Sequence, residues 1–168
     1  AEGQASARLS DHKRLIHSLE KQGRLNRGLE GLPDDANMDE RARVQAGLTR
    51  PEISVLLAYS KMRLFDELMA ANIGNDAYLA RSLEHYFPKV LSKKYPTAIA
   101  SHPLRSEIIA THVTNQIGNR MGSTFGNYLQ EEMGAEASDM ARAFTAACDI
   151  IQAQSLWHEL DRVTLIID

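Results

Sequence analysis

Several features are scarce or missing in this sequence of 168 residues, and each absence excludes a class of protein. The single cysteine, Cys148, cannot form an internal disulfide, which fits a reducing compartment. No run approaches the roughly 20 apolar residues that cross a bilayer. The first residues lack the basic start and apolar middle of a secretory signal. The net charge of -3 gives no strong field for nucleic acid phosphates or an anionic membrane. We therefore expect a cytoplasmic protein with neither nucleic acid nor membrane as a partner.

The remaining composition, 43% hydrophobic and 24% charged residues, is that of an ordinary globular protein and excludes a disordered chain. The length allows one domain with a packed core. No repeat of fixed period and no low-complexity linker divides the sequence. The sequence therefore predicts a single domain over residues 1–168. Because helical spacing of apolar residues dominates, we predict that this domain is all-α.

The clearest local pattern is the segment Leu48–Glu52. Thr49 and Glu52 can form a capping box, and Pro51 is tolerated because first-turn amides have no helical partner. The helix that follows, about residues 50–71, is apolar over most of its circumference, which is typical of a helix in the middle of a bundle. Its apolar face is widened by Val55, Ala58, Met62 and Met69, and its narrow polar strip consists of Glu52, Arg63, Asp66 and Glu67.

A second long core helix is predicted over about residues 104–121, because Pro103 can open it and Gly122 can end it. Other helices are expected over 6–22, 38–46, 77–86, 124–133 and 139–152 and from Ser155, with a helical turn at 25–32 and short pieces after Pro88 and Pro96. Gly23, Gly47, Gly74 and Gly134 are predicted helix stops, and Ser123, Ser138 and Ser155 are predicted caps. About eight to ten helices with short turns predict an irregular multi-helix bundle.

The sequence contains no complete set of residues for catalysis or cofactor binding. The glycines are scattered at predicted helix ends, and Gly118–Gly122 has neither the spacing nor the preceding strand of a dinucleotide-binding turn. No histidine pair has the spacing and glutamate of a zinc hydrolase; the histidines are His12, His17, His85, His102, His112 and His158. Cys148 lies in an apolar helical run, where a small core residue is expected in preference to a reactive thiol. We therefore predict no catalytic, cofactor or metal residue.

The most interesting constellation lies on the predicted helix 104–121. At about 100° per residue, Asn115 and Asn119 share a stripe with apolar residues, so both are expected to be at least partly buried. A stripe of small residues permits close approach by another helix; it consists of Ala110, Thr114 and Gly118. Two interpretations stay open. The amides, with Arg120, tie loop backbone into the bundle, or Asn115, Asn119 and Arg120 line an interface with a neighbouring domain.

Several blocks of the sequence resemble one known family in the same order. They are Arg24-Leu25-Asn26-Arg27 with Glu30-Gly31-Leu32-Pro33, the fifteen residues of 47–61, Tyr86-Phe87-Pro88, residues 104–111 and residues 119–125. These blocks are similar to the very large bacterial NAD-specific glutamate dehydrogenases, in the region that follows the catalytic domain. The resemblance covers about residues 9–161. Residues 1–8 and 163–168 depart from the pattern and are predicted to be disordered or foreign to the native chain.

The resemblance implies a parent enzyme that deaminates L-glutamate oxidatively to 2-oxoglutarate and ammonia and reduces NAD. It implies that the catalytic residues and the NAD site lie in the preceding part of the chain, so that this segment holds no cofactor. The implied partners are the catalytic domain of the parent chain and further copies in a homo-oligomer. A structural, interdomain or oligomerisation role follows for this segment.

Two other hypotheses remain from the residues alone. One is a free-standing helical module whose partner docks on the small-residue face of the helix over 104–121. The other is an autonomous enzyme, which the absence of a catalytic set disfavours. Glutamate-dependent NADH production by the pure chain would support the enzyme, and recovery of only unrelated proteins from a host lysate would support the module.

Overall fold

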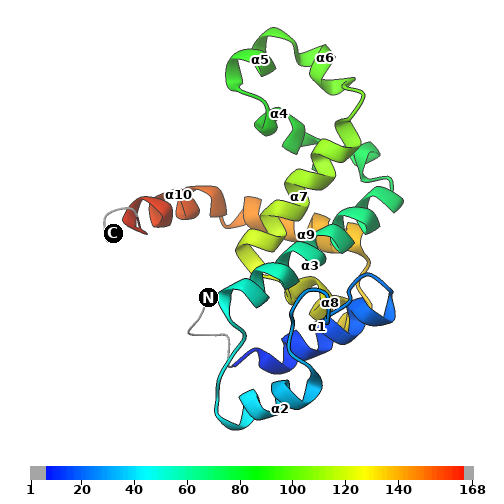
Figure 1. The fold of residues 1–168 in the computed structure, drawn as a ribbon. Coiled ribbons are helices and arrows are strands. Elements are labelled where there is room, and N and C mark those ends of the chain that lie inside the picture. The colour runs from blue at the N-terminus through cyan, green and yellow to red at the C-terminus, as the bar shows by residue number, and fades with distance from the viewer. Residues whose placement is uncertain (1–6, 165–168) are drawn as a thin grey trace.

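The computed structural model describes residues 7–164, apart from the side chains of residues 84, 85 and 164, as an irregular assembly of helices (Figure 1). The helices are α1 (Leu9–Lys21), α2 (Asp35–Arg43), α3 (Arg50–Ala70), α4 (Ser82–Tyr86), α5 (Lys89–Lys94), α6 (Pro96–Ala100), α7 (Arg105–Met121), α8 (Phe125–Met133), α9 (Ala137–Ile150) and α10 (Ala153–Thr164), with 3-10 turns η2 (Ile73–Asn75) and η3 (Leu79–Arg81). Within residues 7–164 no strand is present, which confirms the all-α prediction.

The chain ends fall partly outside this range. Residues 1–6 and 165–168, part of the segments predicted to be disordered or foreign, lie outside the described residues. Residues 7 and 8 form a turn before α1, and α10 continues through Val163 and Thr164. The helix at the end of the chain therefore extends two residues into the segment for which disorder was predicted.

The capping box that begins α3 forms as predicted. The Thr49 amide donates to the Glu52 carboxylate at 2.7 Å, and the Thr49 side chain accepts from the amide of Glu52. The Arg41 guanidinium of α2 also donates twice to this carboxylate, at 2.7 and 3.0 Å. One carboxylate therefore caps α3 and fastens α2 to it, which fixes where the long helix begins.

This arrangement makes stability depend on pH. Burial opposes ionisation of Glu52, but the hydrogen bonds from Arg41 and Thr49 outweigh it and hold the pKa of Glu52 below its ordinary value of 4.5. Since the pKa is lowered in the folded state, the stabilisation is complete above that value and is lost as pH falls through the folded pKa. We expect Glu52→Gln to lower the free energy of unfolding by about 1 to 2 kcal/mol at pH 7. Thermal unfolding from pH 7 to pH 3 should show this difference shrinking below pH 4.5; a difference independent of pH would contradict the account.

Helix α3 joins two hydrophobic clusters. Leu56 in its first half packs with α1, α2 and the loop between them. Leu64 and Leu68 in its second half pack with η2, η3, α4, α7 and α9. Figure 1 shows α7 crossing α3 at the centre of the molecule, with α1 and α2 at one end and α4–α6 at the other. The prediction of two long core helices is confirmed for both segments.

The first end of the molecule is tied together by Arg27, which lies in one of the blocks that resemble the family. Its guanidinium donates to Glu20 at 2.8 and 2.7 Å and to Asp35 at 2.9 Å. Hydrogen bonds from Arg27 and His17 lower the pKa of Asp35 to about 2. Residues 25–32, predicted as a helical turn, form turns instead, and their conformation is stabilised by these side-chain bonds.

The prediction for the faces of α3 was wrong at three positions. Arg63 was assigned to a polar strip, but only 3% of it is exposed because α1 and α8 both pack over that side. Met62 was assigned to the apolar face, but 49% of it is exposed. Ala58 is exposed on the same side. A helix that is apolar over most of its circumference is thus covered only where another helix happens to pass.

Several helix ends also differ from the predictions. Positive φ angles at Gln45 (55°) and Asn72 (54°) end α2 and α3, where the prediction relied on Gly47 and Gly74. Gln152 (52°) also has a positive φ angle and follows α9, close to the helix end predicted at about residue 152. Gly23 and Gly134 do adopt positive φ after α1 and α8, as predicted. Ser138 and Ser155 lie inside α9 and α10 and cap neither helix. Non-glycine residues thus take the left-handed conformation at these helix ends, which residue type alone did not indicate.

Candidate functional site

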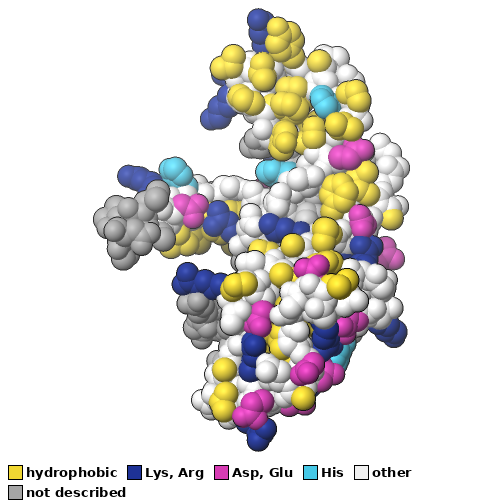
Figure 2. All heavy atoms as spheres, in the orientation of Figure 1, with side chains coloured by type: hydrophobic (Ala, Val, Ile, Leu, Met, Phe, Trp, Pro, Cys, Tyr) yellow, Lys and Arg dark blue, Asp and Glu magenta, His cyan; other side chains and the backbone are white. Residues whose placement is uncertain are grey.

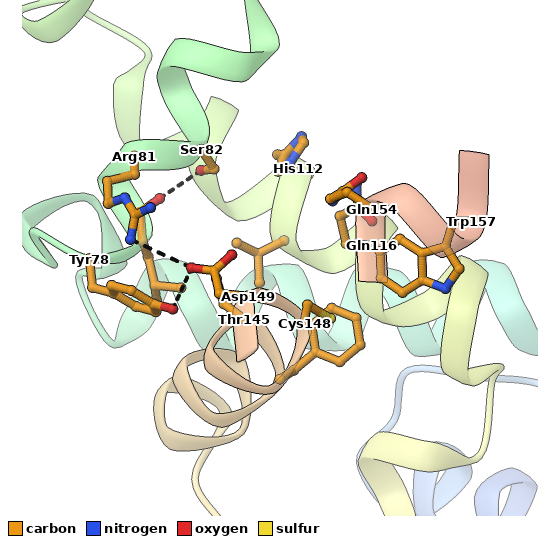
Figure 3. A pocket seen from close by; sticks show the side chains of 13 residues that line it. Tyr78, Arg81, Ser82, His112, Gln116, Thr145, Cys148, Asp149, Gln154 and Trp157 are labelled. Carbon is orange, nitrogen blue, oxygen red and sulfur yellow. Dashed lines mark hydrogen bonds and ion pairs between the residues drawn. The ribbon is translucent and has the colours of Figure 1, made fainter. Parts of the chain in front are cut away.

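A cleft with polar and apolar lining residues lies between η3, α7, α9 and α10. Its volume is about 320 Å³. Figure 3 shows Tyr78, directly before η3, and Arg81, within η3, on one wall of the cleft, with Asp149 of α9 beside them. Trp157 of α10 lies on the other side. The floor is formed by polar side chains of α7, among them His112 and Gln116. Four segments, of which only α9 and α10 are neighbours in the sequence, therefore contribute to one cleft.

The first wall consists of mutually paired groups. The Tyr78 hydroxyl donates to Asp149 at 2.7 Å, and the Arg81 guanidinium lies 3.5 Å from the same carboxylate. The hydrogen bond to Asp149 raises the pKa of Tyr78, and burial adds to the rise. Tyr78 is therefore protonated at neutral pH and cannot act as a base.

The second wall fixes α10 against the bundle. The rings of Phe144 and Trp157 stack at 6.5 Å between centroids, with 15° between their planes. The Arg120 guanidinium lies 4.6 Å from the Trp157 ring centroid and 3.4 Å from Asp161. A cation over an indole face is worth about 0.5 to 2 kcal/mol. Arg120 thus attaches the last helix to α7.

Cys148 and His112 both line the cleft, which raises the question of a nucleophile. Burial raises the pKa of the Cys148 thiol, and the charge of Asp149 raises it further. A reactive cysteine needs the opposite shift, because the thiolate is the nucleophile. The prediction that Cys148 is a poorly reactive residue agrees with this direction, although it lines a cleft and is only partly buried.

Comparison with known proteins decides the family. The model of the family "Glutamate dehydrogenase, C-terminal" matches residues 45–167. The chain belongs to this family. It is 36% identical to the NAD-specific glutamate dehydrogenase of Pseudomonas aeruginosa and 30% identical to that of Mycobacterium tuberculosis, over 97% of its own length in both. It is 36% identical to the Halomonas elongata enzyme over 91% of its length.

The chain spans about a tenth of the length of these curated relatives. It corresponds to a C-terminal part of the large NAD-specific glutamate dehydrogenases. No solved structure matches it. The resembling block 47–61 covers the capping box and the first half of α3, so the residues that carry the family resemblance also determine where the central helix begins.

Asn115, Asn119 and Arg120, the residues predicted to contact a neighbouring domain, lie next to this cleft on the outward side of α7. A groove of about 380 Å³ is lined there by Tyr86, Thr111, His112, Asn115, Gln116, Asn119 and Arg120. The expectation that Asn115 and Asn119 are partly buried was wrong, because both are exposed. Their carbonyl oxygens accept from the Lys61 ammonium of α3 at 3.0 and 2.7 Å.

The stripe of small residues on α7 behaves as predicted. Ala110, Thr114 and Gly118 are buried, and α3 packs closely against α7. The Lys61 side chain lies directly over Gly118, and its ammonium then reaches the two amides. Close packing of the helices therefore positions the polar contact. No local pattern in the sequence marks Lys61, Tyr78, Arg81, Asp149 or Trp157, because each meets its partner from a distant segment.

Within residues 7–164, no group of three or more histidine, cysteine, aspartate or glutamate side chains could hold a metal ion. None of the helices described there is both long enough and apolar enough to cross a membrane. The polar face of α7 and the cleft beside it are therefore the strongest candidate site.

Proposed function

We propose that this chain is the non-catalytic C-terminal helical part of an NAD-specific glutamate dehydrogenase and that it serves a structural, interdomain or oligomerisation role. The reaction of the parent would be the conversion of L-glutamate, NAD and water to 2-oxoglutarate, ammonia and NADH. The observation that carries this proposal is that charged groups of the cleft and of the groove beside it are paired within the chain. Asp149 is held by Tyr78 and Arg81, and Arg120 is held by Trp157 and Asp161. NAD is proposed to bind in the preceding part of the parent.

The proposed contact with the rest of the enzyme includes the outward face of α7 with Asn115, Asn119 and Arg120. These side chains are exposed although they belong to the central helix, and they line a groove of about 380 Å³. The exposed amide groups of Asn115 and Asn119 offer N–H donors to another polypeptide surface, and the Arg120 guanidinium, held by Trp157 and Asp161, borders them. Such polar groups are typical of the rim of an interface. The partners proposed are the catalytic domain of the parent chain and other copies of it.

One substitution distinguishes a role of Asn119 in contact with the rest of the enzyme from a role in packing within this chain. Asn119→Leu should change the free energy of unfolding of the chain by less than about 1 kcal/mol, because the amide is exposed and Asn115 still accepts from Lys61. In the full-length enzyme the same change should weaken subunit or domain association, measured by light scattering and thermal unfolding, with KM for glutamate and NAD unchanged. Gln22→Leu, at an exposed amide after α1, is the matched control. A large loss of stability in the chain alone would favour local packing as the role of Asn119.

The alternative is a free-standing helical interaction module. An antibody raised to this chain would distinguish the two hypotheses by the size of the polypeptide that it detects in a host lysate. A band far larger than this chain that co-migrates with NAD-dependent glutamate dehydrogenase activity supports the proposed parent. A band of the size of the chain alone supports the module.

A further inference from the structure

The segment α4–α6 forms an arm that projects from the N-terminal end of α7 (Figure 1). Its large hydrophobic residues are mostly uncovered. Leu83 and Ile99 attach it to the bundle, whereas α5 has no buried residue. The exposed members are Tyr86, Val90, Leu91 and Tyr95, and Val90 is 75% exposed. Figure 2 shows hydrophobic side chains gathered over this arm, in contrast to the mixed charges at the opposite end of the molecule.

Such an arm is unfavourable in isolation, because apolar area in water costs about 25 cal/mol per Å². Scattered apolar residues on a surface need no explanation, but a gathered set is typical of an interaction site. In the described part Leu83 and Ile99 are buried and Phe87 packs partly against the core, which leaves the cost of the other large hydrophobic residues of the arm without an offset. A surface outside residues 7–164 would supply the missing contacts.

The charge of the arm restricts what can cover it. Lys89, Lys93 and Lys94 lie on it, and all three are exposed. A cavity of about 490 Å³ beneath the arm is lined by the cations Arg81, Lys93 and Arg105 together with apolar side chains, and by no carboxylate of a described side chain. The Nε atom of Arg105 is buried without a hydrogen-bond partner in this part of the chain. An apolar surface that carries a carboxylate would complement both features.

We propose that the arm is a docking surface for the upstream part of the same polypeptide, through an apolar segment with at least one carboxylate that reaches Lys93 and Arg105. This inference rests on the proposed function. The matched relatives are about ten times as long as this chain, so most of the parent lies outside the structure. A covalently tethered surface has an effective concentration on the order of millimolar, which favours it over a free partner.

The test uses the full-length enzyme with single cysteine variants at two valines. Val90→Cys lies on the arm, and Val44→Cys lies after α2 at a position that is 64% exposed. Maleimide labelling rates are measured against the parent enzyme as a blank, and each is normalised to the rate in the denatured protein. We expect Val90→Cys to label at least about tenfold more slowly than Val44→Cys, because a docked surface excludes the reagent. A ratio near one overturns the proposal.

A photo-crosslinking amino acid at position 90 then identifies the occupant. Crosslinks to the upstream part of the same polypeptide support the proposal. Crosslinks between two copies, or to another protein, overturn it. Lys93→Glu should raise the labelling rate of Val90→Cys at least about threefold, whereas Lys21→Glu, an exposed lysine at the end of α1, should leave it unchanged. Equal effects of both reversals exclude the carboxylate contact.

These outcomes are independent of the test of the proposed function. If the antibody detects only a short polypeptide without dehydrogenase activity, the proposed function fails and no upstream segment exists. If the parent is confirmed but Val90→Cys labels as fast as Val44→Cys, only the docking of the arm fails. The two results therefore identify which proposal is wrong.

Discussion

Replacing Arg63 with alanine is expected to lower the free energy of unfolding by about 3 kcal/mol. Arg63 is 3% exposed and lies where α1, α3 and α8 meet. Its guanidinium donates to the buried Asn127 amide oxygen at 3.0 Å and lies 3.6 Å from the Glu67 carboxylate. The alanine variant loses the hydrogen bond, leaves a buried amide without its partner and opens a cavity. Urea unfolding followed by circular dichroism measures the loss.

The contributions of packing and hydrogen bonding can be separated at this position. Burial lowers the pKa of Arg63, since the interior disfavours its charged form despite Glu67. The positive charge is therefore not the source of the stability. Arg63→Met keeps most of the volume and should lose less than the alanine variant. In the double variant with Asn127→Leu, the combined loss should be smaller than the sum of the two single losses, because no unpaired polar group remains.

A matched control is Arg43→Ala. Arg43 pairs with Glu40 on the surface of α2, and its side chain is 76% exposed. Water screens such a pair, so no measurable change is expected. Equal losses at Arg43 and Arg63 would contradict the argument from burial.

Gly74→Ala is expected to produce the second large loss, about 2 kcal/mol. Gly74 is buried in η2 against α7. A Cβ atom added there would overlap the hydroxyl of Ser106 and would lie 2.8 Å from its Cβ and 3.0 Å from its Cα. Because the obstacle includes main-chain atoms of α7, η2 must move away from the helix. Thermal unfolding of the variant measures the cost, and Ser106→Gly in the same chain should recover part of it.

Gly118→Ala is the control for this prediction. Its added Cβ would lie 2.6 Å from the Cε atom of Lys61, which is the far end of a flexible side chain. Lys61 can move, and alanine favours the helix by about 1 kcal/mol over glycine. The net change should be near zero, with the loss of the bonds to Asn115 and Asn119 as its only cost. A loss as large as that of Gly74→Ala would mean that Lys61 is held rigidly.

The fold was largely predictable from short-range signals. The capping box at Thr49 fixes the start of α3, and Pro103 and Gly122 bracket α7 to within a residue or two. These signals act within one helical turn, so neighbouring residues contain them completely. Helix ends formed by non-glycine residues, such as Asn72, could not be predicted, since tertiary packing imposes their positive φ.

The candidate site was predictable only in part. Apolar periodicity correctly marked Ala110, Thr114 and Gly118 as a face for close packing. The same periodicity led to the wrong prediction that Asn115 and Asn119 are partly buried. Periodicity shows which residues share a face of a helix, but it does not show which face another helix covers. Asp149 meets Tyr78 across 71 positions of sequence, and no local pattern connects them.

The sequence alone determined that this chain is all-α, where its two long helices lie, and which family its blocks resemble. Only the tertiary structure decided that Arg63 is buried, that the amides of α7 reach Lys61 and that the arm α4–α6 is left uncovered. The physical reason is the range of the interactions. Caps and periodicity act between residues a few positions apart, whereas burial depends on the simultaneous packing of helices that the sequence separates widely.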